Sequence, residues 1–272
     1  MVQKAKYLIS QVSPDMISKV LMVMRKNKSY TNQDIENHLS KKGELTASFS
    51  KYIGEISNIL VQFEVLTNQN NEFFLSDFGL KMKKILLKNR SFFFEIYHLY
   101  LYYIFDLKSQ DYNFLPYRSY RLLCDYIFNS EKIQNSKTIA DHIDSRIKET
   151  YNVQGSFSEA CITRGKVWIK ELSPSIIDED NNKIQRKPNH TEILLLGIDF
   201  YYRVSKLKHN DPLFIDSKVK NKISQSLLIS PNHFDDILSE ISKKFSKYIT
   251  VKYNVAGTYI ILNKLVNIDD LY

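Results

Sequence analysis

The chain has 272 residues, of which 43% are hydrophobic and 25% are charged, a balance typical of a globular protein rather than a disordered or fibrous one. Its 7 glycines and 6 prolines are too few for glycine-rich phosphate loops or for sandwiches built from many tight turns. The net charge is +8, and residues 1–90 hold 14 Lys and Arg against 8 Asp and Glu, which suggests a polyanionic partner unless an AT-rich codon bias explains the lysines.

Two short helices are expected at the start of the chain. Ser13 can cap a helix that has Pro14 in its first position, and apolar residues at helical spacing carry this helix to about Lys26. Thr31 can then cap a second helix that ends near residues 42–43.

A longer third helix is expected to begin at a cap on Thr46 or Ser48. Its apolar face runs from Tyr52 to Phe63. The opposite face carries short polar and basic groups of the kind that a groove-reading helix needs, namely Ser48, Ser50, Lys51 and Asn58. Glu55 departs from this pattern, because a carboxylate near phosphates is unfavourable.

A small hairpin and a basic helix follow. The polar run 67–72 predicts the tip of the hairpin, and Phe73 to Ser76 predicts the returning strand. From Asp77 onward a further helix carries several lysines, among them Lys81 and Lys84.

The order helix, helix, helix, hairpin, helix, together with the segment from Phe73 to Gly79, resembles the winged-helix family of transcription regulators. In that family a strand of the form Y-x-L-T-x-x-G often follows the wing, and here Ser76 takes the threonine position. The resemblance covers residues 13–90. It implies contact with DNA or RNA, although winged helices also dock proteins. The expected DNA-binding residues are Thr46, Ser48, Ser50, Lys51, Asn58, Asn68, Gln69, Asn70, Asn71, Lys81 and Lys84.

The middle block, residues 91–188, is rich in aromatic side chains between positions 92 and 126. Such residues could stack on unpaired bases, but their helical spacing and few charges favour a protein core or a dimer interface. Helices are also expected over 137–151 and around 161–169. With an apolar pair of strands near 176–184 they could form a degenerate second winged helix, and a plain helical connector is the preferred interpretation.

The C-terminal block, residues 189–272, predicts three helices and a terminal hairpin, which is again a winged-helix outline. One of these helices begins after Asp211-Pro212, and the third, opened by Ser230-Pro231, carries Asp235, Asp236 and Glu240. Those carboxylates would repel phosphate, so protein contact or dimerisation is as reasonable here as contact with DNA. The predicted fold class is therefore mainly α with small β-hairpin wings, in domains 1–90, 91–188 and 189–272.

No catalytic motif is recognisable. The six histidines are scattered, and Asp141 and Asp144 lack the partners that a nuclease would need. We therefore expect neither an enzyme nor a cofactor or metal site. Cys124 and Cys161 are read as buried thiols, and with no secretory signal or membrane span in the sequence we expect a cytoplasmic protein.

The sequence thus predicts a non-enzymatic protein that binds double-stranded DNA, as a transcriptional regulator or an accessory subunit, and that forms a homodimer. One alternative is a protein-interaction scaffold of a bacterial DNA-processing or phage-defence complex, with the aromatic middle block docking the partner. A plasmid replication initiator, which also resembles paired winged helices, is another alternative.

Overall fold

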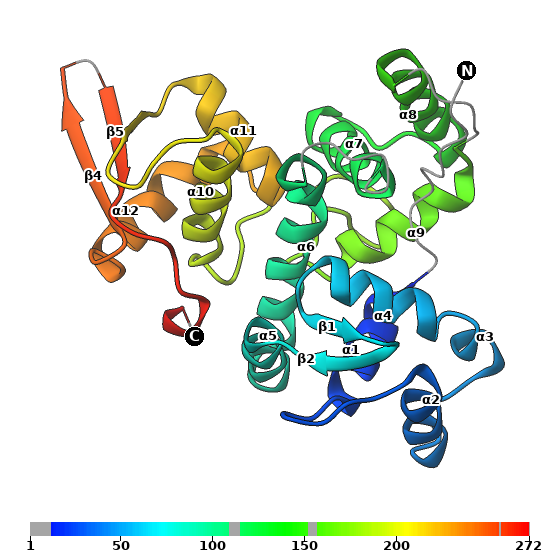
Figure 1. The fold of residues 1–272 in the computed structure, drawn as a ribbon. Helices are drawn as coiled ribbons and strands as arrows, with labels where there is room; N and C mark the ends of the chain where they lie inside the picture. Colours follow the sequence, from blue (N-terminus) through cyan, green and yellow to red (C-terminus); the bar gives the residue numbers. More distant parts are fainter. Residues whose placement is uncertain (1–11, 109–114, 152–156, 256, 272) are drawn as a thin grey trace. The chain divides into compact units, whose positions relative to one another are not determined.

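The computed structural model describes residues 12–108, 115–151, 157–255 and 257–271. This part of the chain is mainly helical with two small antiparallel sheets, which confirms the predicted fold class (Figure 1). It forms two compact units, residues 12–94 and 95–271. Among the described helices, none is both long and apolar enough to cross a membrane.

The first unit contains five helices and one hairpin. Its helices are α1 (Pro14–Val23), α2 (Asn32–Lys41), α3 (Ala47–Ser50), α4 (Ile53–Gln62) and α5 (Asp77–Lys88), and its strands are β1 (Leu66–Gln69) and β2 (Glu72–Leu75). The three helices α1, α2 and α4 pack on one another around Ile17, Ile35 and Ile56, all fully buried.

The predicted helix caps are present in this unit. The Ser13 hydroxyl accepts from the backbone N–H of Met16 at 3.3 Å, and Thr31 forms a reciprocal capping box with Asp34. The first helix, however, ends at Val23 rather than near Lys26. Beyond that point the chain turns extended, and the Lys83 ammonium bonds to main-chain carbonyls at the end of the helix.

A third strand position completes the small sheet of the first unit. Tyr30 pairs with Phe73 as an isolated bridge, through backbone N–H···O bonds of 3.0 and 2.9 Å in the two directions. The returning strand β2 therefore lies between Tyr30 and β1. The sequence did not predict this pairing, because a single residue leaves no periodic pattern.

The middle part of the second unit is helical, as expected. Helix α6 (Arg90–Leu107) begins in the first unit and continues into the second, and α7 (Leu115–Asn129), α8 (Ser136–Tyr151) and α9 (Glu159–Lys170) follow. The strand pair suggested near 176–184 exists as one bridge between Ile177 and Lys183. Most of the aromatic side chains that the structure describes between positions 92 and 126 are buried, which supports the core interpretation.

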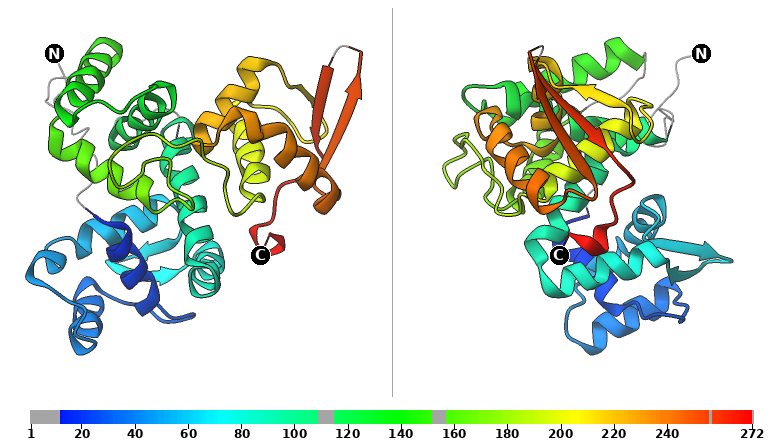
Figure 2. Two further views of the ribbon diagram at one scale, coloured as in Figure 1. Left: turned by 180° about the vertical axis from the view of Figure 1, so that it is seen from behind. Right: turned by 90° about the vertical axis from the view of Figure 1, so that its left-hand side faces the viewer.

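The C-terminal part of the second unit combines helices with a three-stranded sheet. Its elements are α10 (Ile193–Val204), β3 (Pro212–Phe214), α11 (Ser217–Leu227), the short 3-10 helix η2 (Pro231–His233), α12 (Phe234–Lys244), β4 (Ile249–Asn254), β5 (Gly257–Leu262) and η3 (Ile268–Asp270). The strand order is β3-β5-β4, with Leu213 paired to Ile260 and Val251 paired to Ile260 from the other side. Figure 2 shows β4 and β5 as two long adjacent strands. The sequence missed β3 and expected a helix directly after Pro212.

Candidate nucleic-acid interface

The predicted recognition helix is two helices in the structure, which corrects the sequence interpretation. Thr46 caps α3 by accepting from the backbone N–H of Phe49 at 3.1 Å, and α4 begins only at Ile53. Between them the N–H of Tyr52 donates to the carbonyl of Phe49, three residues back, at 2.9 Å. Gly54, which lowers helix propensity, comes just after this turn.

Two hydroxyl groups hold α3 and α4 against α2. Ser50 donates to the carboxylate of Glu36, and Ser57 donates to the Asn32 side-chain oxygen at 2.9 Å. The Ser50 hydroxyl, which the sequence assigned to DNA, therefore already has a partner inside the unit. Its role in the structure is to fix the orientation of α3.

The other predicted residues on this surface are exposed. Ser48 and Lys51 are exposed on α3 and its turn, and Asn58 is exposed on α4. Glu55 is half-exposed on α4 and lies four residues after Lys51, so the surface formed by α4 and the turn before it presents one cation and one anion. This surface offers donors and acceptors to a base edge but little positive charge for phosphates.

The wing is a tight hairpin with a polar tip. Gln69 pairs with Glu72, so the turn consists of Asn70 and Asn71 alone, with φ angles of 53° and 65°. Asparagine tolerates this left-handed backbone better than most residues, and the geometry is that of a two-residue hairpin turn. The predicted tip of 67–72 was thus too long, since β1 extends through Gln69. The Asn68 side chain accepts from the N–H of Asn71 at 3.1 Å, and the predicted wing residues Asn68, Gln69, Asn70 and Asn71 are all exposed.

The two predicted lysines of α5 belong to a different element. Lys84 is exposed and Lys81 is half-exposed, and their helix packs on α1 and β2. Neither α3 nor α4 carries these side chains. The structure therefore divides the predicted DNA-binding residues among α3, α4, the hairpin and α5.

A basic cluster that the sequence analysis did not single out lies beside α5. The Lys83 ammonium donates to the carbonyl of Met22 at 2.9 Å and to that of Met24. Burial lowers the pKa of Lys83, and the nearby positive charges of Lys42 and Arg25 lower it further. Lys42 and Arg25 thus each repel the Lys83 ammonium. In the sequence, each of these residues stands in a basic pair, at 25–26, 41–42 and 83–84.

The segment from Phe73 to Gly79, on which the family resemblance rests, contains two residues that the packing of this unit explains. The Ser76 hydroxyl accepts from the N–H of Gly79 at 2.8 Å and can donate to the carbonyl of Glu64 at 2.5 Å or of Val65 at 3.1 Å, so it caps α5 and fastens it to the residues just before the hairpin. A Cβ atom at Gly79 would overlap the same Val65 carbonyl. Serine and glycine are therefore required here for packing, whether or not the unit binds nucleic acid.

The C-terminal module presents a different surface. On α12 the carboxylates of Asp235, Asp236 and Glu240 are exposed, as the sequence indicated. At the hairpin tip, Tyr253 is 70% exposed and Val255 is fully exposed. A polyanion would meet unfavourable charge on this helix.

The described residues include no cluster of three or more His, Cys, Asp or Glu side chains that could hold a metal ion. Asp144, considered for a nuclease, instead binds the Lys148 ammonium and the N–H of Phe157. Both cysteines are buried and unpaired, as predicted. Comparison with models of known protein families and with curated proteins finds no match for this chain.

Proposed function

We propose that the first unit binds double-stranded DNA, and that the protein is a non-enzymatic transcriptional regulator or a DNA-binding accessory subunit. One observation carries the proposal: a helix pair with exposed polar groups, Lys51 and Asn58 among them, is followed directly by a hairpin whose tip is exposed asparagine. A helix and an adjacent hairpin of this kind suit the major groove and the neighbouring backbone of a duplex.

The basic cluster supports the same proposal. The positive charges of Arg25 and Lys42 disfavour the charged form of Lys83, and a phosphate beside these side chains would offset that effect. Phosphate contacts supply most of the affinity of non-specific binding, while groups such as Asn58 supply discrimination between bases. The proposal therefore assigns affinity to the cluster and specificity to α4 and the wing.

The test is binding of the full chain to random and parental-genome DNA fragments at about 50 and 200 mM salt. We expect binding that weakens steeply with salt, since each neutralised phosphate releases counterions. The double variant Lys51→Glu/Asn58→Asp should weaken binding at least about tenfold, because it places two new carboxylates on the DNA-facing surface.

A matched control carries the same chemical changes elsewhere. Asn221→Asp/Lys222→Glu alters two exposed residues of α11 in the second unit and should leave the affinity unchanged. If both variants lose the same DNA affinity, only net charge matters, and DNA contact can no longer be assigned to the surface that carries Lys51 and Asn58. If the wild-type protein fails to bind at low salt, the DNA proposal is wrong.

A second candidate is a protein-interaction role for the C-terminal module. It is favoured by the exposed Tyr253 and Val255 at the tip of β4–β5, beside a helix whose acidic groups disfavour DNA. The specific form we propose is a homodimer through this hairpin. Light scattering on the wild type and on Tyr253→Ser/Val255→Ser should show a dimer that becomes a monomer; a monomeric wild type would exclude it.

A further inference from the structure

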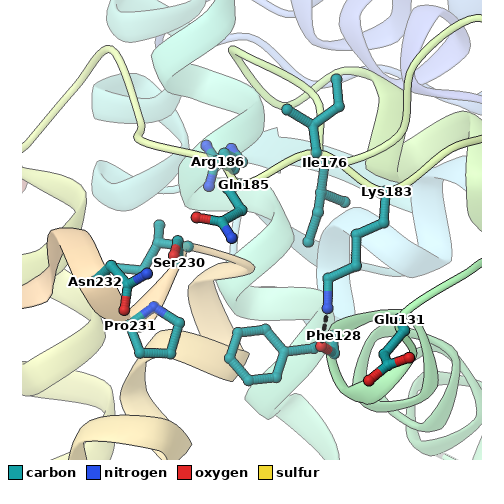
Figure 3. Close-up of a pocket in the computed structure, with 11 residues that line it drawn as sticks. Phe128, Glu131, Ile176, Lys183, Gln185, Arg186, Ser230, Pro231 and Asn232 are labelled. Atoms are coloured by element: carbon teal, nitrogen blue, oxygen red, sulfur yellow. Dashed lines mark hydrogen bonds between the residues drawn. The ribbon is translucent and has the colours of Figure 1, made fainter.

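A pocket in the second unit lies between the end of α7, the segment 176–186 and the residues just before α12. Its volume is about 480 Å³, within the range of sites that take small molecules. The walls are mixed: the rings of Phe128 and Pro231 and the side chain of Ile176 lie beside polar and charged side chains. Figure 3 shows the two rings bordering the same open space.

Three polar side chains of this pocket are unused by the protein itself. Gln185, Ser230 and Asn232 line it, and their side chains form no hydrogen bond with any residue that the structure describes. The Gln185 amide points toward the space between Phe128 and Pro231 (Figure 3). Each side-chain amide offers hydrogen-bond donors and an acceptor. Together the two amides can therefore bind a ligand edge that carries both donors and acceptors.

The charges at the pocket balance. The Lys183 ammonium donates to the carbonyls of Phe128 and Ser130 and retains one further N–H, and Glu131 lines the same pocket with a carboxylate. Burial lowers the pKa of Lys183 while Glu131 raises it. Arg186 also lines the pocket, but its charge is compensated by Glu95. The remaining cation and anion, Lys183 and Glu131, favour neither an anionic nor a cationic ligand, so the occupant should be neutral.

We propose that this pocket binds a neutral, planar nitrogen heterocycle of nucleobase or nucleoside size. Side-chain amides pair with the mixed donor and acceptor edges of such rings, as Asn and Gln do with adenine, and aromatic and proline rings pack on their faces. The pocket belongs to the second unit and includes no residue of the proposed DNA surface. The inference goes beyond the proposed function and does not depend on it.

The test is isothermal titration calorimetry of the full chain, without DNA, with adenosine, guanosine, cytidine and uridine as probes. We expect at least one nucleoside to bind with a stoichiometry of one. The variant Gln185→Ala/Asn232→Ala should weaken that binding about tenfold, because it removes two amide contacts of ordinary strength. Both residues are exposed, so the change should leave folding intact.

Two controls make the result decisive. Gln134→Ala truncates an exposed glutamine that does not line the pocket and should bind as the wild type does. The 5′-monophosphate of the best nucleoside should bind no more tightly than the nucleoside itself. Tighter binding of the monophosphate would overturn the neutral-ligand inference, and no binding of any nucleoside, or equal binding by the double variant, would overturn the site.

Discussion

The N-terminal module, residues 12–88, and the C-terminal module, residues 193–271, repeat one order of elements. Each runs helix, strand position, helix, a short helix (α3 or η2), helix, strand, strand, and in each the last strand lies between the other two. The first strand differs: it is a single bridge at Tyr30 in one module and the three-residue strand β3 in the other. The same topology can therefore be built with very different amounts of sheet.

The two modules also differ in how they are supported. In the N-terminal module, Ser76 and Gly79 hold α5 against the carbonyl groups of Glu64 and Val65, just before the hairpin. The C-terminal module is fastened to α6 by buried polar groups: the Arg186 guanidinium binds Glu95 and donates to the carbonyl of Leu227 at 2.6 Å. One module is held by close contact with the backbone and the other by a buried ion pair. Mutations at these two places should change the free energy of unfolding by different amounts, which can be measured.

The largest effect is expected at the buried ion pair. Glu95 and Arg186 are both fully buried, so Arg186→Met leaves an uncompensated carboxylate in the core and should lower the free energy of unfolding by about 3–5 kcal/mol. Lys220→Met breaks the exposed pair with Asp235 and should change it by less than about 1 kcal/mol. Urea denaturation of both variants measures the contrast. Similar values for the two would show that the buried pair does not secure the module.

Part of the fold could be predicted from local sequence, and part could not. Caps such as Ser13 and Thr31 act within one turn, so the residues that follow them reveal the helix. The bridge at Tyr30, the strand β3 and the partner of Glu95 depend on residues tens of positions away. No periodic pattern records such pairings. The exposure of Lys51 and Asn58 was predictable for the same local reason, whereas the bond between Ser50 and Glu36 was not.

The next effect compares two helical glycines. Gly79→Ala forces a methyl group against the rigid Val65 carbonyl, so the hairpin or α5 must move, and we expect a loss of about 3 kcal/mol. At Gly197 of α10 the new Cβ meets the Leu227 side chain at 2.7 Å, and that side chain can rotate away. Gly197→Ala should therefore cost about 1 kcal/mol, after the gain in helix propensity is included. Equal losses in thermal or urea unfolding would contradict this difference between backbone and side-chain contact.

The pH dependence of stability should come from the second unit. His98 is buried, with one ring nitrogen 2.8 Å from the Tyr120 hydroxyl and the other 2.9 Å from the carbonyl of Ser226. Burial, together with the nearby charge of Arg186, lowers the pKa of His98 to about 3. The unfolded chain takes up this proton near pH 6.5 and the folded chain does not, so stability falls as the pH decreases below 6.5.

Between pH 7 and pH 5 the free energy of unfolding should fall by about 2 kcal/mol, at about 1.4 kcal/mol for each pH unit below 6.5. Urea denaturation at several pH values measures it. His98→Gln is less stable at every pH but should lose this slope, because glutamine does not titrate. A slope that persists in His98→Gln would assign the effect to other groups.

The last two effects are expected at the two hairpin tips, where they should have opposite signs. Asn71 already has the left-handed backbone that glycine adopts freely, so Asn71→Gly should stabilise the protein by no more than about 0.5 kcal/mol. Gly257 has a φ of 131°, which other residues rarely adopt, and an added Cβ would lie 2.8 Å from the Phe214 ring. Gly257→Ala should cost about 1–2 kcal/mol.

Precise urea midpoints are needed to resolve these two values, with the slope of the transition held constant. A loss on Asn71→Gly would show that the asparagine side chain itself stabilises the wing. The Asn71 side chain is exposed, and we assign it no role in folding. If Asn71→Gly keeps its stability but binds DNA more weakly, the asparagine side chain contacts the duplex. At the tip of the C-terminal hairpin, stability and binding cannot be changed separately in this way, because the packing of Phe214 requires glycine at position 257.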